Sequence, residues 1–151
     1  MSDQPMRDFA ANTAMPDMGD EVPWSPPTKP LSECRVAIVT TAALHTADDD
    51  GFDPDDVSFR VLPSERRDLR LGHWSPNFDR SGFTADLDVV YPIDRLDELA
   101  ARGVIGSVAP RHYAFAGNQE DTLTGIRLDS GPAVAKLLRD DDVDVVLLTP
   151  V

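Results

Sequence analysis

Along most of the chain, short apolar runs alternate with segments whose apolar residues follow a helical spacing. Residues 36–41 form a short β-branched run, which predicts a buried strand. Residues 57–62 alternate apolar and polar side chains up to Pro63, which predicts a half-exposed strand that ends at the proline. A further short strand is predicted at 69–71, and a strand or edge segment at 104–109.

Two helices are predicted between these strands. Residues 92–103 place apolar side chains on one helical face, between a proline suited to a first turn and a glycine suited to a stop. A second helix is expected after Asp129 or Ser130 as its N-cap, with Pro132 in its first turn. Segment 88–91 is compatible with a short strand or with the approach to the first helix.

The last strand is the clearest element, since residues 143–150 are almost continuously apolar. A strand, a helix and a strand joined by short links imply parallel pairing. The pattern therefore predicts an α/β fold, an open and mostly parallel sheet with flanking helices, Rossmann-like or flavodoxin-like. In such sheets ligands bind beyond the carboxyl ends of the strands. A helix usually covers a core strand of this kind, so we expect a domain that is truncated after the strand, with one sheet face bare.

The N-terminal fifth of the chain has a different composition. Residues 1–33 hold six of the 13 prolines, and proline opposes both regular helices and central strands. We therefore expect a proline-rich, partly disordered arm over 1–33 and the α/β domain over 34–151. Trp24 either pins this arm onto the domain or is presented to a partner.

Charge and cysteine content narrow the class of protein. The net charge of -13 opposes binding to nucleic acid or to anionic membranes. No apolar run reaches the length of about 18 residues that a membrane span needs, so no membrane association is expected. The one cysteine, Cys34, cannot form an internal disulfide, which fits the reducing cytoplasm.

Searches for local chemical motifs give negative results. The chain has no phosphate-binding glycine loop and no G-x-S-x-G nucleophile turn. The acidic stretch 48–56 lacks the glycine and glutamate register of a calcium loop. The three histidines are too far apart in sequence for a local metal motif. We therefore expect no cofactor and no metal in this chain.

Two histidines lie where the predicted fold would place a site. His45 follows the carboxyl end of the first strand, and His112 follows another predicted strand. A polar pocket at the carboxyl edge of the sheet would hold both, whereas the alternative for each is an ordinary structural histidine. Cys34 precedes the first strand, at the opposite edge, and is interpreted as a bystander thiol.

A series of short elements between residues 23 and 151 also carries a family resemblance. The chain resembles the component B selenoprotein family of the glycine, sarcosine, betaine and D-proline reductases, and within it the short, stand-alone members. The resemblance rests on the order and joint presence of Pro23-Trp24, 29–31, 35–41, 58–60, His73, 78–80, 92–96, 103–106, 109–113 and 147–151.

The resemblance implies a mechanism. In that family the Thr-Pro-Val segment, here 149–151, is followed by selenocysteine or cysteine, then by a short spacer and another cysteine. The selenolate attacks a carbon that a pyruvoyl group on a partner subunit activates as an iminium, and the C–N bond is cleaved reductively. His45, His112 and Thr149 would then line the pocket of the nucleophile. A thioredoxin-like protein or selenoprotein A would supply the electrons.

The family motif reaches the last residue given, Val151, where the nucleophile would follow. Because UGA encodes selenocysteine and also serves as a stop codon, we expect that a UGA was read as a stop there. A TAA or TAG codon after Val151 would contradict this hypothesis. Two alternatives stay open: a thiol or selenol redox protein with another small-molecule substrate, and a non-catalytic interaction domain that dimerises through Trp24 and a bare sheet face.

Overall fold

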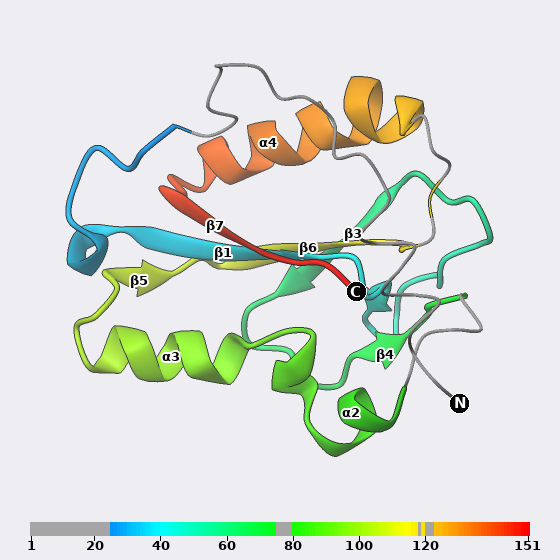
Figure 1. The fold of residues 1–151 in the computed structure, drawn as a ribbon, viewed down its shortest axis with the longest axis horizontal. Coiled ribbons are helices and arrows are strands. Elements are labelled where there is room, and N and C mark those ends of the chain that lie inside the picture. Colours follow the sequence, from blue (N-terminus) through cyan, green and yellow to red (C-terminus); the bar gives the residue numbers. More distant parts are fainter. Residues whose placement is uncertain (1–24, 75–79, 118, 120–122) are drawn as a thin grey trace, which may run out of the picture.

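The computed structural model describes residues 25–74, 80–117, 119 and 123–151, and the bounds below refer to these (Figure 1). One sheet forms the centre of the domain. Its strands are β1 (Arg35–Thr40), β3 (Phe59–Pro63), β5 (Ser107–Val108), β6 (Arg111–Phe115) and β7 (Val145–Thr149). β1 is almost wholly buried, as its continuous β-branched sequence predicts.

The pairing around β1 confirms the mostly parallel sheet. β1 pairs in parallel with β5, β6 and β7, and its register with β7 runs from Val36 opposite Val145 to Thr40 opposite Thr149. β3 pairs antiparallel with β6. β3 and β6 therefore lie on one side of β1, and β7 pairs with β1 alone among the described strands. The carboxyl ends of β1, β6 and β7 therefore meet at one edge.

Helices cover both faces of this sheet, which completes the α/β class (Figure 1). One face packs on α3 (Ile93–Ala101), α2 (Arg80–Ala85) and the 3-10 turn η2 (Leu87–Val89). The other face packs on α4 (Gly131–Asp140), where Val134 and two leucines meet Tyr113 and Phe115 of β6. The amphipathic spacing of both long helices is what buries these apolar side chains.

A small second sheet lies beside the first. Its antiparallel strands β2 (Leu44–His45) and β4 (Arg70–Leu71) are two residues long. The predicted strand at 69–71 thus exists, but it pairs with a segment that the sequence pattern did not reveal. This pairing places His45 opposite Arg70, and the residues that follow β4 lie next to the carboxyl edge of the main sheet.

Several element predictions are confirmed and two are wrong. Segment 88–91 is the approach to α3, and Gly103 stops that helix with a φ of +69°. β3 ends at Pro63, as predicted, and begins at Phe59. Ser130 does not cap α4, because it ends a π-helix, η3 (Ile126–Ser130), that runs directly into α4. His112 lies inside the buried strand β6, not after a strand.

The outer strand β7 remains exposed despite its apolar sequence. Leu148 is 67% exposed, and Val146 and Leu147 are 37% and 38% exposed. Among the described residues, β7 pairs with β1 alone. A groove of about 450 Å³ runs along β7, lined on one side by Ser25 and Pro27. In the described part of the chain, the exposed apolar surface of the sheet is thus limited to the outer strand β7, whereas the expected bare sheet face is not seen because helices pack on both faces of the sheet. The expected truncation stays a prediction.

The arm is described from residue 25 onward. It reaches the short 3-10 turn η1 (Leu31–Glu33), and Lys29 forms an ion pair of 2.8 Å with Asp144 next to β7. The Sγ of Cys34 donates to the carbonyl of Pro30, and Cys34 is fully buried. Trp24 lies outside the described residues, so both of its predicted roles, and the division at residue 33, stay predictions.

None of the described helices is both long enough and apolar enough to cross a membrane.

Candidate functional site

The carboxyl edge of the sheet is held together by threonines. The Oγ1 of Thr41 accepts from the backbone N–H of Val151 at 2.9 Å and donates to its carbonyl at 3.3 Å. The Oγ1 of Thr40 and the N–H of Thr41 both donate to the carbonyl of Thr149. The segment after β7 is thus fixed on the end of β1, in the region where open α/β sheets bind their ligands.

Thr149 lies at this edge, as the sequence predicts. Its Oγ1 donates to the carbonyl of Val90 at 2.9 Å, which ties β7 to the segment that precedes α3. This hydrogen bond of the Thr149 hydroxyl helps to fix the end of β7. Its predicted place in the pocket of a nucleophile stays a prediction.

His45 is buried on β2 between two glycines. A Cβ built on Gly51 or Gly72 would lie 3.6 Å from its Nε2, so both backbones pack on the imidazole. The Nδ1 of His45 lies 3.0 Å from the carbonyl of Thr46. Gly72 is further fixed by a hydrogen bond from its N–H to the carbonyl of Ala43. The loop that contains Gly51 therefore covers one side of the His45 ring.

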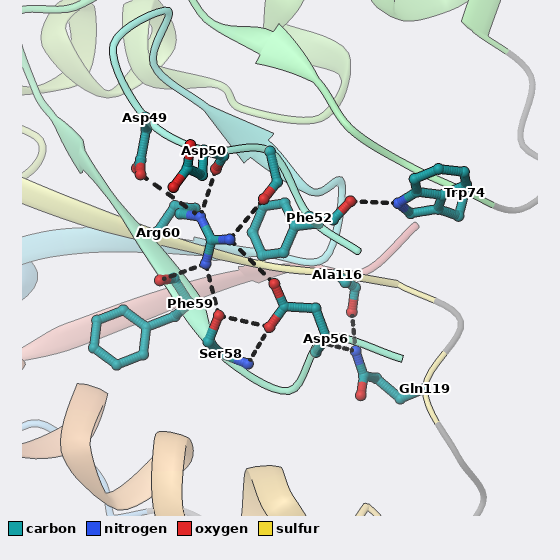
Figure 2. Close-up of polar contacts among 11 residues, drawn as sticks. Asp49, Asp50, Phe52, Asp56, Ser58, Phe59, Arg60, Trp74, Ala116 and Gln119 are labelled. Carbon is teal, nitrogen blue, oxygen red and sulfur yellow. Dashed lines mark hydrogen bonds and ion pairs between the residues drawn. The ribbon is translucent and has the colours of Figure 1, made fainter. Parts of the chain in front are cut away.

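That loop, residues 48–56, is the acidic stretch considered for calcium, and an arginine of β3 occupies its centre (Figure 2). Arg60 donates to the carbonyls of Asp50 and Gly51 at 2.8 and 2.7 Å and forms an ion pair with Asp56 at 3.1 Å. Its guanidinium also stacks on Phe52, 4.4 Å from the ring centroid. The guanidinium of Arg60 thus occupies the centre of the acidic loop and binds its carbonyl and carboxylate oxygens.

The same loop is joined to the segment after β4. Trp74 donates its indole N–H to the carbonyl of Phe52, as Figure 2 shows. In the part of the chain that the structure describes, no group of three or more His, Cys, Asp or Glu side chains is arranged to hold a metal ion.

His112 belongs to the core on the α3 side of the sheet. It is fully buried, its Nδ1 accepts from the N–H of Ile38 at 2.9 Å, and its ring meets Tyr91 edge to face at 5.5 Å. Burial, aided by the positive charge of Arg67, lowers the pKa of His112 to about 4. His112 is therefore neutral at pH 7, and it replaces a strand carbonyl as an acceptor. Its predicted place in the pocket stays a prediction, and the contacts described here are structural.

His73 is a candidate that the sequence-based selection of site residues missed. It is 6% exposed and follows β4. A Cβ on Gly117 would lie 2.3 Å from the Nε2 of His73 and 3.0 Å from the carbonyl of Thr41. Burial, aided by the positive charge of Arg80, lowers the pKa of His73 below its ordinary value. No local pattern marks this position, because Gly117 and Thr41 come from distant parts of the sequence.

The three predicted site residues are not assembled into one cluster. Among the described residues, no hydrogen bond or ring contact joins the side chains of His45, His112 and Thr149. His112 and Thr149 are related indirectly, because they contact the neighbouring residues Tyr91 and Val90. The polar groups that converge at the carboxyl edge are those of the threonines, with His73 beside them and His45 on the adjacent small sheet.

The fold and this edge define an α/β domain whose polar end lies beyond the carboxyl ends of parallel strands. Residues 70–151 match the family model described as glycine/sarcosine/betaine reductase selenoprotein B. This segment is more than half of the chain and runs from β4 through β7. The chain belongs to this family, as the resemblance predicted.

Curated relatives agree with this assignment. The chain is 35% identical over 129 residues to the D-proline reductase subunit gamma of Acetoanaerobium sticklandii, covering 83% of this chain and 52% of that protein. It is 29% identical over 144 residues to the glycine reductase complex component B subunit gamma of Symbiobacterium thermophilum, covering 86% and 31%. It is 28% identical over 146 residues to the sarcosine reductase complex component B subunit beta of Peptoclostridium acidaminophilum, again covering 86% and 31%.

The chain thus spans about half the length of the D-proline relative and about a third of the other two. These relatives are named as subunits of reductases. No solved structure matches the chain.

Proposed function

We propose that this chain is the nucleophile-bearing part of a reductase subunit that cleaves a C–N bond in a small amino-acid-like substrate. The nucleophile would be a selenocysteine or cysteine that follows Val151 in the full protein. The observation that carries the proposal is the pair of hydrogen bonds at the Oγ1 of Thr41, which accepts from the N–H of Val151 and donates to its carbonyl. It would fix the next residue at the carboxyl edge, where sites in this class of sheet lie.

The chemistry has to balance two electrons. The selenolate or thiolate attacks the carbon that carries the amino group, a bond from that carbon to selenium or sulfur forms, and the amine leaves with the electrons of the C–N bond. The thiolate of a second cysteine then attacks the selenium or sulfur, and the carbon keeps the electron pair and takes a proton. An external dithiol, of thioredoxin or selenoprotein A type, reduces the resulting selenide-sulfide or disulfide and supplies both electrons.

Partner subunits are part of this proposal. The family mechanism places a pyruvoyl group on another subunit, where it would activate the substrate carbon. Pro150 and Val151 are exposed, so a partner can approach the edge from solvent. No pyruvoyl site is proposed within this chain. We place the complex in the cytoplasm, because a selenol or thiol nucleophile has to stay reduced.

One observation favours a second function, that of an interaction domain. β7 presents Val146, Leu147 and Leu148 to solvent along an outer strand edge. Exposed apolar strands of this kind commonly pair with another chain. A partner would cover this surface in either function, so assembly alone does not separate them and an activity is needed.

The test uses the full-length protein, produced in a host that inserts selenocysteine and purified with the subunits that accompany it. Four separate reactions each contain dithiothreitol and one substrate: D-proline, glycine, sarcosine or betaine. We expect one of the four to be cleaved, with one dithiol consumed per C–N bond. A variant with serine in place of the residue after Val151 should lose roughly 1,000-fold or more of this rate. If none of the four is cleaved while the nucleophile reacts with iodoacetamide, the proposed function is wrong.

A further inference from the structure

His73 lies near Thr41, the residue whose hydroxyl is hydrogen-bonded to Val151. Beyond β1 and β6, Ala42 and Ala116 form one more bridge, and Ala43 donates its N–H to the carbonyl of Phe115. This pairing brings Gly117 next to Thr41. A Cβ built on Gly117 would lie 2.3 Å from the Nε2 of His73 and 3.0 Å from the carbonyl oxygen of Thr41, so both atoms lie close to Gly117.

The close approach depends on a glycine. Real Cβ atoms essentially never come as near to a nitrogen as 2.3 Å, so any side chain at position 117 would displace the imidazole. Gly117 therefore seats His73 against the carbonyl side of Thr41, whose hydroxyl side holds Val151. Thr41 thus bonds to Val151 through its hydroxyl, while its carbonyl lies on the side of the His73 imidazole.

The surroundings of His73 favour a neutral imidazole. It is almost fully buried, and the guanidinium of Arg80 donates to its carbonyl at 2.7 Å. Both the burial and this nearby positive charge lower the pKa of His73. A neutral imidazole can accept a proton, and the imidazolium that results would stand beside an anion.

We propose that His73 is the proton partner of the nucleophile that follows Val151. This inference rests on the proposed function for the position of that nucleophile. The imidazole accepts the proton of the selenol or thiol: the Se–H or S–H bond breaks, an N–H bond forms, and a selenolate or thiolate remains next to the imidazolium. No electrons are exchanged in this step. His45 packs between Gly51 and Gly72, whereas the Nε2 of His73 is the atom nearest to a Cβ built on Gly117, which also lies 3.0 Å from the carbonyl of Thr41.

The pH dependence of alkylation tests this pairing in the full-length protein. Iodoacetamide reacts with the anionic nucleophile, and the rate against pH gives a midpoint. Because the imidazolium stabilises the anion, His73→Gln should raise this midpoint by about one pH unit or more, a slowing of about fivefold or more at the parental midpoint. Gly117→Ala should raise it as well, since its Cβ displaces the imidazole and leaves the residue in the chain.

Trp74→Phe is the matched control. It changes the neighbouring residue and removes the bond to Phe52, but it keeps the imidazole, so it should leave the midpoint within about 0.2 units. An unchanged midpoint in His73→Gln, or an equal shift in Trp74→Phe, would overturn the inference. Cys34 does not confuse the assay, because it is fully buried in the folded protein.

The outcome is separable from that of the proposed function, because alkylation needs no substrate. A midpoint that depends on His73, together with no cleavage of the four substrates, would support the pairing and contradict the reductase. Cleavage of a substrate with a midpoint that does not depend on His73 would do the reverse. Far-UV circular dichroism at each pH shows that the variants are folded where the rates are compared.

Discussion

Lowering the pH from 7 to 5 is expected to reduce the free energy of unfolding by about 2 kcal/mol through His112 alone. The pKa of His112 is about 4 in the folded protein and near 6.5 when unfolded, because burial disfavours the imidazolium. Between pH 6.5 and about 4, His112 is therefore protonated in the unfolded chain but mostly neutral in the folded protein. The stability that His112 contributes at pH 7 is thus lost as the pH falls, progressively until about pH 4.

Urea unfolding at pH 7, 6 and 5 measures this slope. His112→Asn is expected to remove most of it, whatever its cost at pH 7, because an amide does not titrate. Tyr91→Phe is the control: it keeps His112 and the ring contact and removes an Oη that has no hydrogen-bond partner among the described residues, so the slope should persist. A parental slope in His112→Asn would contradict this account. The lowered pKa of His73 also makes the free energy of unfolding fall with pH. The difference in slope between the parent and His112→Asn therefore gives the part that is due to His112.

Replacing Arg60 with alanine is expected to cost about 3 kcal/mol, since its partners would be left without a cation in a largely buried place. The side chain is 14% exposed and that of Asp56 is 16% exposed, so water screens this pair poorly. The carbonyls of Asp50 and Gly51 would also lose their donor. Arg60→Lys keeps the charge but not the planar fork, so it should cost about half as much.

The matched control is Arg95→Ala on α3. Arg95 forms ion pairs with Asp88 and Glu98, but its side chain is 57% exposed, so the loss should stay below about 1 kcal/mol. Urea midpoints compare the variants, and hydrogen exchange of residues 48–56 should rise in Arg60→Ala alone. A cost in Arg60→Ala no larger than that in Arg95→Ala would show that the loop does not depend on Arg60.

The sequence predicted those elements whose signal is local. β1, β7 and α3 each carry their own apolar period, and Gly103 marks a stop that the structure shows with a positive φ. β6 was missed because Arg111 and His112 make it look polar. In the structure the imidazole of His112 takes the place of a backbone acceptor, which makes a histidine compatible with a central strand.

Other features could not be derived because they depend on contacts between distant residues. The two-residue strands β2 and β4 are stabilised by their pairing and are too short for a periodic signal. The start of α4 follows a π-helix, which a search for N-caps cannot anticipate. His73 becomes a candidate only when Gly117 and Thr41 are known to lie beside it.

The central claim, that a redox nucleophile follows Val151 at the carboxyl edge of the sheet, is tested most directly by mapping alkylation in the full-length protein from its own host. The protein is reduced, treated with iodoacetamide while folded, digested and analysed by mass spectrometry. We predict a carbamidomethyl group on a selenocysteine or cysteine directly after Val151, with Cys34 unmodified until the protein is denatured. A polypeptide with any other residue at that position, or none, would contradict the claim.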